Sequence, residues 1–172
     1  MKFILLLTWL FTGLTFSDTQ WVKLGDTELD WGYKTPYRIT LLAPKGIHDA
    51  DDLRNGVQMM QFEIEWLVPK TSQEQVHQHF RELLEGSLGD SESIKFNQVI
   101  INRLIKKLPA AQRADTWHFY YSPDSGTSLV IGDQDLHTII GSEVNRALHH
   151  AWLLKDPVTT AKLLNRLLKV GK

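Results

Sequence analysis

An alternation of apolar and polar side chains over residues 57 to 68 constrains the fold more than any other feature of this chain. The apolar positions are Met60, Phe62, Ile64 and Trp66. Because the period is two, the segment indicates a β-strand with one face in a core. Pro69 ends the strand, and Ser72 with Gln75 three residues later predicts the capped start of a helix.

Similar patterns predict the other elements. Apolar residues at helical spacing predict helices at residues 72–85, 91–108, 143–154 and 157–170. The second helix, capped by Ser91 or Ser93, is expected to bury Phe96, Val99, Ile100, Leu104, Ile105 and Leu108. Strands are predicted at residues 36–43, 115–122, 127–131 and 136–140, and a pair of short strands at 21–29, turning at Gly25-Asp26. Residues 44–56 are rich in turn formers and predict a surface loop.

The order of these elements predicts the fold class. Strands come first, followed by two helices, a three-stranded meander and two further helices. This order is typical of an α+β protein, in which a layer of helices covers one face of an antiparallel sheet. Any ligand cleft is expected between the two layers.

Composition excludes several classes of protein. The 172 residues suffice for one domain and include no cysteine, which excludes thiolate nucleophiles, Cys-ligated zinc and iron-sulfur clusters. The formal net charge of −1 gives no general attraction to nucleic acid, and no local basic patch stands out, so no nucleic-acid partner is expected.

The first 17 residues have the pattern of a secretory signal peptide. Lys2 supplies a positive start, an apolar stretch follows, and Thr15 and Ser17 are fairly small residues before a cleavage site at Asp18. A membrane span needs about 20 apolar residues, and this stretch is shorter. Residues 18–172 are therefore predicted to form a single periplasmic or secreted domain, with no stable membrane span after cleavage.

Neither a metal nor a cofactor is expected. Although the chain has seven histidines, His77 and His79 point to different sides of a helix, and no H-E-x-x-H motif is present. Phosphate-binding glycine loops and the G-x-S-x-G nucleophile motif are also missing from the sequence. Aromatic residues on predicted strands and helices, including Trp66 and Trp117, indicate either core packing or an apolar pocket.

Four segments together resemble the chalcone isomerase family, in particular its exported bacterial branch. They are IEWLVPKTSQE at 64–74, LIKKLP at 104–109, DTWHFYYSPDSGTSLVI at 115–131 and IGSEVNRALHHAWLL at 140–154. The similarity spans residues 33 to 168 and implies an open-faced β-sandwich, an antiparallel sheet covered by helices.

The resemblance also implies where a site would lie, and it predicts that the isomerase reaction is lost. Isomerases carry a tyrosine, a lysine and an asparagine on the helix after the Pro-x-Thr turn, and the matching positions here are Gln75, Gln78 and Glu82. Their catalytic threonine falls near Tyr37, and their essential arginine has no counterpart in residues 21–33. Because one lost oxyanion donor costs about 3 to 4 kcal/mol, no chalcone isomerase activity is expected.

Non-catalytic members of the family hold a fatty acid, whose carboxylate is gripped by an arginine and a tyrosine. Tyr37 can supply the hydroxyl, whereas Arg38 is predicted to point to the opposite face of its strand. Ligand contacts are expected at Tyr37, Gln75, Gln78, Glu82, Trp117 and Tyr120.

Three functions remain open at this stage. The first is binding of a fatty-acid-like or other apolar small molecule. The second is an enzyme of unknown reaction that uses Tyr37, His118 and Tyr120. The third is a structural or partner-binding protein whose cleft is filled by Trp66 and Trp117.

Overall fold

Six strands form one antiparallel sheet in the part of the chain described by a computed structural model, residues 19–31, 34–46 and 49–153. They lie in the order β1-β2-β3-β6-β7-β8. Their bounds are β1 Trp21–Trp31, β2 Lys34–Pro44, β3 Met60–Trp66, β6 Thr116–Ser122, β7 Gly126–Ile131 and β8 Gln134–Ile139. The predicted signal peptide and the predicted helix at 157–170 lie outside the described residues.

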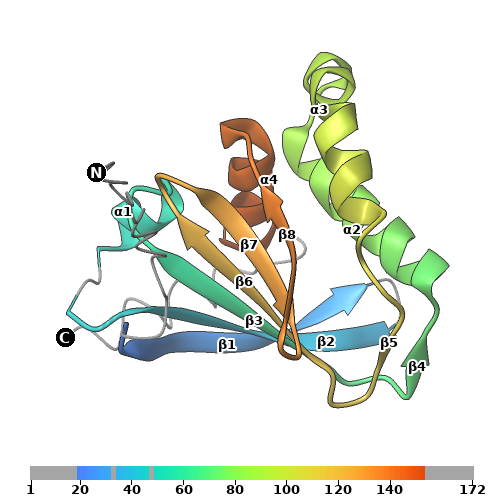
Figure 1. Ribbon diagram of the computed structural model, residues 1–172, viewed down its shortest axis with the longest axis horizontal. Helices are drawn as coiled ribbons and strands as arrows, with labels where there is room; N and C mark the ends of the chain where they lie inside the picture. Colours follow the sequence, from blue (N-terminus) through green and yellow to red (C-terminus); the bar gives the residue numbers. More distant parts are fainter. Residues whose placement is uncertain (1–18, 32–33, 47–48, 154–172) are drawn as a thin grey trace, which may run out of the picture.

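Three long helices gather on one side of this sheet (Figure 1). They are α2 Gln73–Leu88, α3 Ser91–Ile105 and α4 Ser142–Leu153. The chain leaves the sheet after β3, forms α2 and α3, and returns as β6 to pair directly with β3. The α+β layout predicted from the sequence is thus confirmed.

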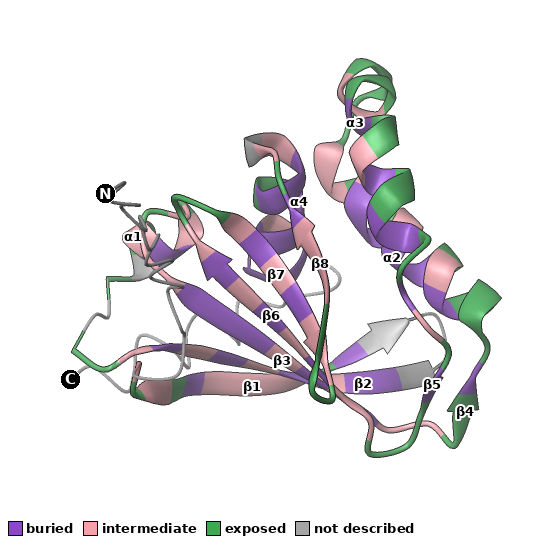
Figure 2. Cartoon of the chain, in the orientation of Figure 1, coloured by how far each residue is buried: buried purple, intermediate pink, exposed green. Residues whose placement is uncertain are grey.

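The alternation that predicted β3 determines which face of the sheet is buried. Met60, Phe62, Ile64 and Trp66 are at most 1% exposed. Ile64 lies opposite Trp117 and Phe62 opposite Phe119, so the inner face continues across the β3–β6 junction. Figure 2 shows this buried strip through the middle strands.

Phe80 of α2 joins the helical layer to the inner face of the sheet. Its ring centroid lies 6.0 Å from that of Trp117, 5.9 Å from that of Phe119 and 6.5 Å from that of Trp152 on α4. All four side chains are fully buried. Each buried aromatic side chain removes about 150 to 250 Å² from water, so this contact is a major source of stability.

Two predictions for the first third of the chain were wrong. The segment at 21–29 is not a pair of strands but part of the single strand β1, which carries a register shift between Lys23 and Gly25. Gly25 therefore marks a bulge rather than a turn. The predicted loop at 44–56 contains a short helix, α1 Ala50–Arg54, which is capped by the side chain of Asp49.

The predicted buried face of α3 was also partly wrong. Phe96 is 82% exposed and Val99 is 69% exposed, whereas Asn97, Ile101 and Leu104 are buried. The N-cap is Asp90 rather than a serine. Two more short strands, β4 Lys70–Thr71 and β5 Ala111–Gln112, pair across the ends of the α2–α3 segment and were not predicted.

The β6–β7 hairpin provides a test of this packing. Gly126 has a φ of 84°, and an added Cβ would overlap the carbonyl oxygen of Ile139. We expect Gly126→Ala to lower the free energy of unfolding by at least about 3 kcal/mol, because strain and steric overlap add together. Gly132 has a φ of 59° but open space around it, so Gly132→Ala should cost only about 1 kcal/mol. Chemical denaturation measures both values, and equal losses would contradict the packing described for Gly126.

Candidate functional site

Tyr37 and His79 form a buried polar pair between the sheet and α2. The hydroxyl of Tyr37 and Nε2 of His79 lie 2.8 Å apart, within hydrogen-bond distance. Tyr37 comes from the inner face of β2 and its ring contacts Trp66 edge-on at 5.3 Å. Burial raises the pKa of Tyr37 well above its usual value, and the side chain of Trp152 offsets only part of this effect. Tyr37 therefore stays a neutral hydroxyl at physiological pH.

The start of α2 places His79 in this position. The predicted capping box is present, since Ser72 and Gln75 hydrogen-bond each other's backbone N–H groups. Counted from that start, Val76, His79 and Leu83 share the stripe that faces the sheet, and all three are buried. Burial lowers the pKa of His79 to about 4, although the negative charge of Glu82 acts in the opposite direction. The imidazole is therefore neutral at pH 7.

Two indole N–H groups close to this pair, those of Trp66 and Trp117, have no hydrogen-bond partner. The indole of Trp152 lies against the hydroxyl of Tyr37. The rings of Trp66 and Trp117 are in contact, with centroids 5.1 Å apart. A buried donor without an acceptor costs about 1 to 3 kcal/mol. The layer thus combines apolar walls with two donors that nothing in the described protein satisfies.

The structure separates the ligand-binding residues predicted from the sequence. Tyr37 and Trp117 lie in the layer between sheet and helices, and both are fully buried. Gln75, Gln78 and Glu82 are exposed on the solvent side of α2, where Gln78 donates a hydrogen bond of 2.8 Å to Glu82. The residues one position further along the chain, Val76, His79 and Leu83, have the same spacing and face the sheet. His79 is the side chain that the sequence comparison missed.

Tyr120 lies on the opposite, outer face of the sheet, away from Tyr37. Its ring stacks on that of His118, with centroids 5.8 Å apart. Arg38 also points outward and pairs with Glu28 and Glu65 at 3.0 Å each. Neither Tyr120 nor Arg38 can contact a ligand held next to Tyr37, which corrects the grouping of Tyr120 with the cleft residues.

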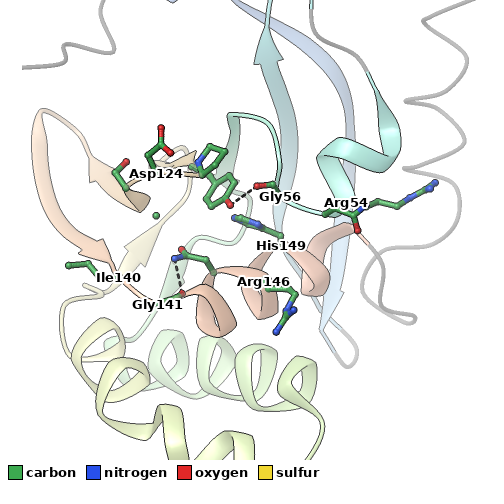
Figure 3. Close-up of a pocket in the computed structure, with 13 residues that line it drawn as sticks. Arg54, Gly56, Asp124, Ile140, Gly141, Arg146 and His149 are labelled. Carbon is green, nitrogen blue, oxygen red and sulfur yellow. Dashed lines mark hydrogen bonds between the residues drawn. The ribbon is translucent and has the colours of Figure 1, made fainter.

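A cavity of about 280 Å³ lies outside this layer, and we call it the end pocket. It is bounded by α1, the β6–β7 turn and the first turns of α4 (Figure 3), and its lining includes Gly56, Tyr121, Gly126, Asn145 and His149. The cleft expected between the layers is instead occupied by the aromatic side chains described above.

Within the described ranges, no group of three or more His, Asp and Glu side chains is arranged to hold a metal ion. None of the helices described there combines the length and the apolar content that a bilayer crossing requires.

Comparison with known proteins identifies the family. A family model described as chalcone isomerase-like matches residues 34–169. The chain belongs to the chalcone isomerase-like family. The resemblance to the chalcone isomerase family is therefore confirmed, and so is the open-faced sandwich that it implies.

A solved structure shows the same fold. The chain is similar to a fatty-acid binding protein of Arabidopsis thaliana, with a TM-score of 0.70 and 16% sequence identity, over 86% of each chain. A search of curated proteins finds no match. The elements that place Tyr37 and His79 therefore belong to a known architecture.

The buried histidines make the stability of the protein depend on pH. An unfolded histidine titrates near pH 6.5, whereas folded His79 titrates near pH 4, so only the unfolded state binds this proton between the two values. The free energy of unfolding should therefore fall as the pH decreases through this range, by up to about 3 kcal/mol for His79.

His79→Gln removes the titrating group. Its free energy of unfolding, measured with urea from about pH 7 to about pH 4, should therefore no longer show this part of the decline. A second decline should remain, because burial and the nearby charge of His150 lower the pKa of His149 to about 3. An unchanged pH dependence in His79→Gln would show that His79 is not buried in the neutral form.

Proposed function

We propose that this protein binds an amphipathic carboxylate of the fatty-acid type between the sheet and the helices, where the aromatic side chains that fill the layer move apart to admit it. The observation that carries the proposal is the buried pair Tyr37–His79, surrounded by aromatic side chains that include two indole N–H groups without acceptors. A carboxylate oxygen accepts from a hydroxyl and from indole N–H groups, and the aromatic walls suit an alkyl chain. The fatty-acid binding protein with the same fold supports this choice.

His79 supplies the charge balance that such a ligand needs. A carboxylate that enters a buried layer without a counter-charge pays a large desolvation cost. The imidazole of His79 can take up one proton as the carboxylate arrives, and the two opposite charges then stabilise each other. We therefore infer that binding is accompanied by uptake of a proton and weakens as the pH rises.

The same layer does not favour the isomerase reaction. Among the described residues, no lysine or arginine is buried, so a developing oxyanion in the layer has no permanent cation beside it. Val76 and Leu83, on the stripe that faces the sheet, are apolar. This supports the expectation from the sequence that chalcone is not turned over, and a binding role agrees better with the side chains present.

Ligand binding is tested with dodecanoic acid and purified protein that has been stripped of lipid. Titration should change the tryptophan fluorescence, because Trp66, Trp117 and Trp152 line the layer. We expect Tyr37→Phe to weaken binding about tenfold or more, since it removes a hydrogen bond to a charged group. The matched control Tyr120→Phe removes the same atom from the outer face and should bind as the wild type does.

Three outcomes would contradict the proposal. They are equal affinities in both variants, equal binding of dodecanol, which has no carboxylate, and efficient conversion of a chalcone to a flavanone. Calorimetry in two buffers of different ionisation enthalpy measures the proton uptake, and a value near zero would remove His79 from the binding role.

We also propose that residues 1–17 direct export and are removed, so that the protein acts outside the cytoplasm. The positive start, the short apolar stretch and the residues before Asp18 support this proposal. Fractionation of producing cells should recover the protein from the periplasm or the medium. N-terminal sequencing should then begin at Asp18, and a chain that keeps Met1 in the cytoplasm would contradict export.

A further inference from the structure

We propose that the end pocket is a second ligand site, which takes a small organic anion beside α4, between His149 and Arg146. This site is separate from the aromatic layer around Tyr37. Its volume of about 280 Å³ is near the lower limit for small-molecule pockets, which suits a short polar metabolite rather than a lipid.

The start of α4 borders the pocket through Gly141 and Asn145. Asn145 N–H donates to the carbonyl of Gly141, which makes Gly141 the residue that precedes the helix. Glycine has no side chain that could cap the helix. The helix dipole favours a negatively charged ligand at this end of α4.

His149 is an independent indication of a ligand in the same place. It lies one helical turn beyond Asn145, is 2% exposed and lines the pocket, yet its Nε2 has no hydrogen-bond partner. Its ring lies against those of Tyr121 and Phe62, with centroids 4.1 Å and 5.8 Å away. Figure 3 shows the imidazole beside Gly56, between α4 and α1. A neutral imidazole with one N–H can donate to a carboxylate or a phosphate oxygen.

The wall of the pocket is held rigidly by Asn145. Its amide nitrogen donates to the carbonyls of Ile139 and Gly141, at 3.0 Å and 2.9 Å, and its oxygen accepts from Thr127 at 2.6 Å. The bonds to Thr127 and Ile139 join α4 to β7 and β8. Because Asn145 is fully engaged within the protein, its role is to position the wall, while the donor for a ligand is His149.

The charges around the pocket favour an anion on the α4 side. Arg146 is exposed and has no ion-pair partner among the described residues, whereas Arg54 is paired with Asp51. The guanidinium groups of Arg54 and Arg146 extend away from the centre in Figure 3, so Arg146 must rotate to cover a ligand. Asp124 on the β6–β7 turn carries the opposing charge, and it should repel an anion toward α4.

The test uses succinate, inorganic phosphate and the neutral analogue succinamide, with purified full-length protein followed by NMR. We expect saturable shifts of the Gly126 and Gly141 amide signals with at least one of the two anions, and no shifts with succinamide. Arg146→Gln should weaken binding about tenfold. Arg103→Gln removes an exposed arginine of α3, outside the pocket lining, and should leave the affinity unchanged. Asp124→Asn should bind the anion several-fold more tightly.

Absence of saturable binding by both anions would overturn the proposal, as would equal binding of succinamide. Identical affinities in Arg146→Gln and Arg103→Gln would also overturn it. Weaker binding of the anions in Asp124→Asn would overturn it as well, because loss of a repelling carboxylate cannot weaken the binding of an anion in this pocket. Dodecanoate binding tested through Tyr37 does not depend on any of these variants, so failure of one site is distinguishable from failure of the other.

Discussion

Contact between aromatic side chains of the sheet and those of α2 and α4 is the interaction on which the rest of this structure depends. Phe80 reaches Trp117 and Phe119 on β6 and Trp152 on α4, so one side chain joins three elements that are distant in sequence. Full burial of one large apolar side chain contributes about 1.5 to 3 kcal/mol. The sheet has one apolar face, and without the helices that face would be open to water.

The same packing determines where charge can exist in the protein. Arg38, Glu28 and Glu65 lie on the outer face of the sheet, where their ion pairs stay close to solvent. Tyr37 and His79 lie inside, and burial keeps both of them neutral. A layer of this kind disfavours reactions that build up an isolated charge, and it favours a ligand that brings its own charge together with an alkyl chain.

Part of the site could be predicted from local sequence because its signals are local. The alternation in β3 and the capping box of α2 depend on neighbouring residues, so their positions were correct. The face of α3 was not, because Phe96 and Val99 are as apolar as the buried Ile101 and only the packing partners distinguish them. Likewise, the positions that the isomerase pattern gave on α2 face solvent, whereas the residues one further along face the sheet, because one residue corresponds to about 100° around a helix.

Local signals in the chain suffice for the α+β class, the family resemblance, most of the strands and the start of α2, because hydrophobic period and capping act over a few residues. The meeting of His79 with Tyr37, the position of Tyr120 on the opposite face and the cavity where α4 begins all arise from packing between distant elements. Those outcomes depend on the angle and depth at which helices pack on a twisted sheet. That geometry results from the fit of many distant side chains at once, and no short segment of the chain encodes it.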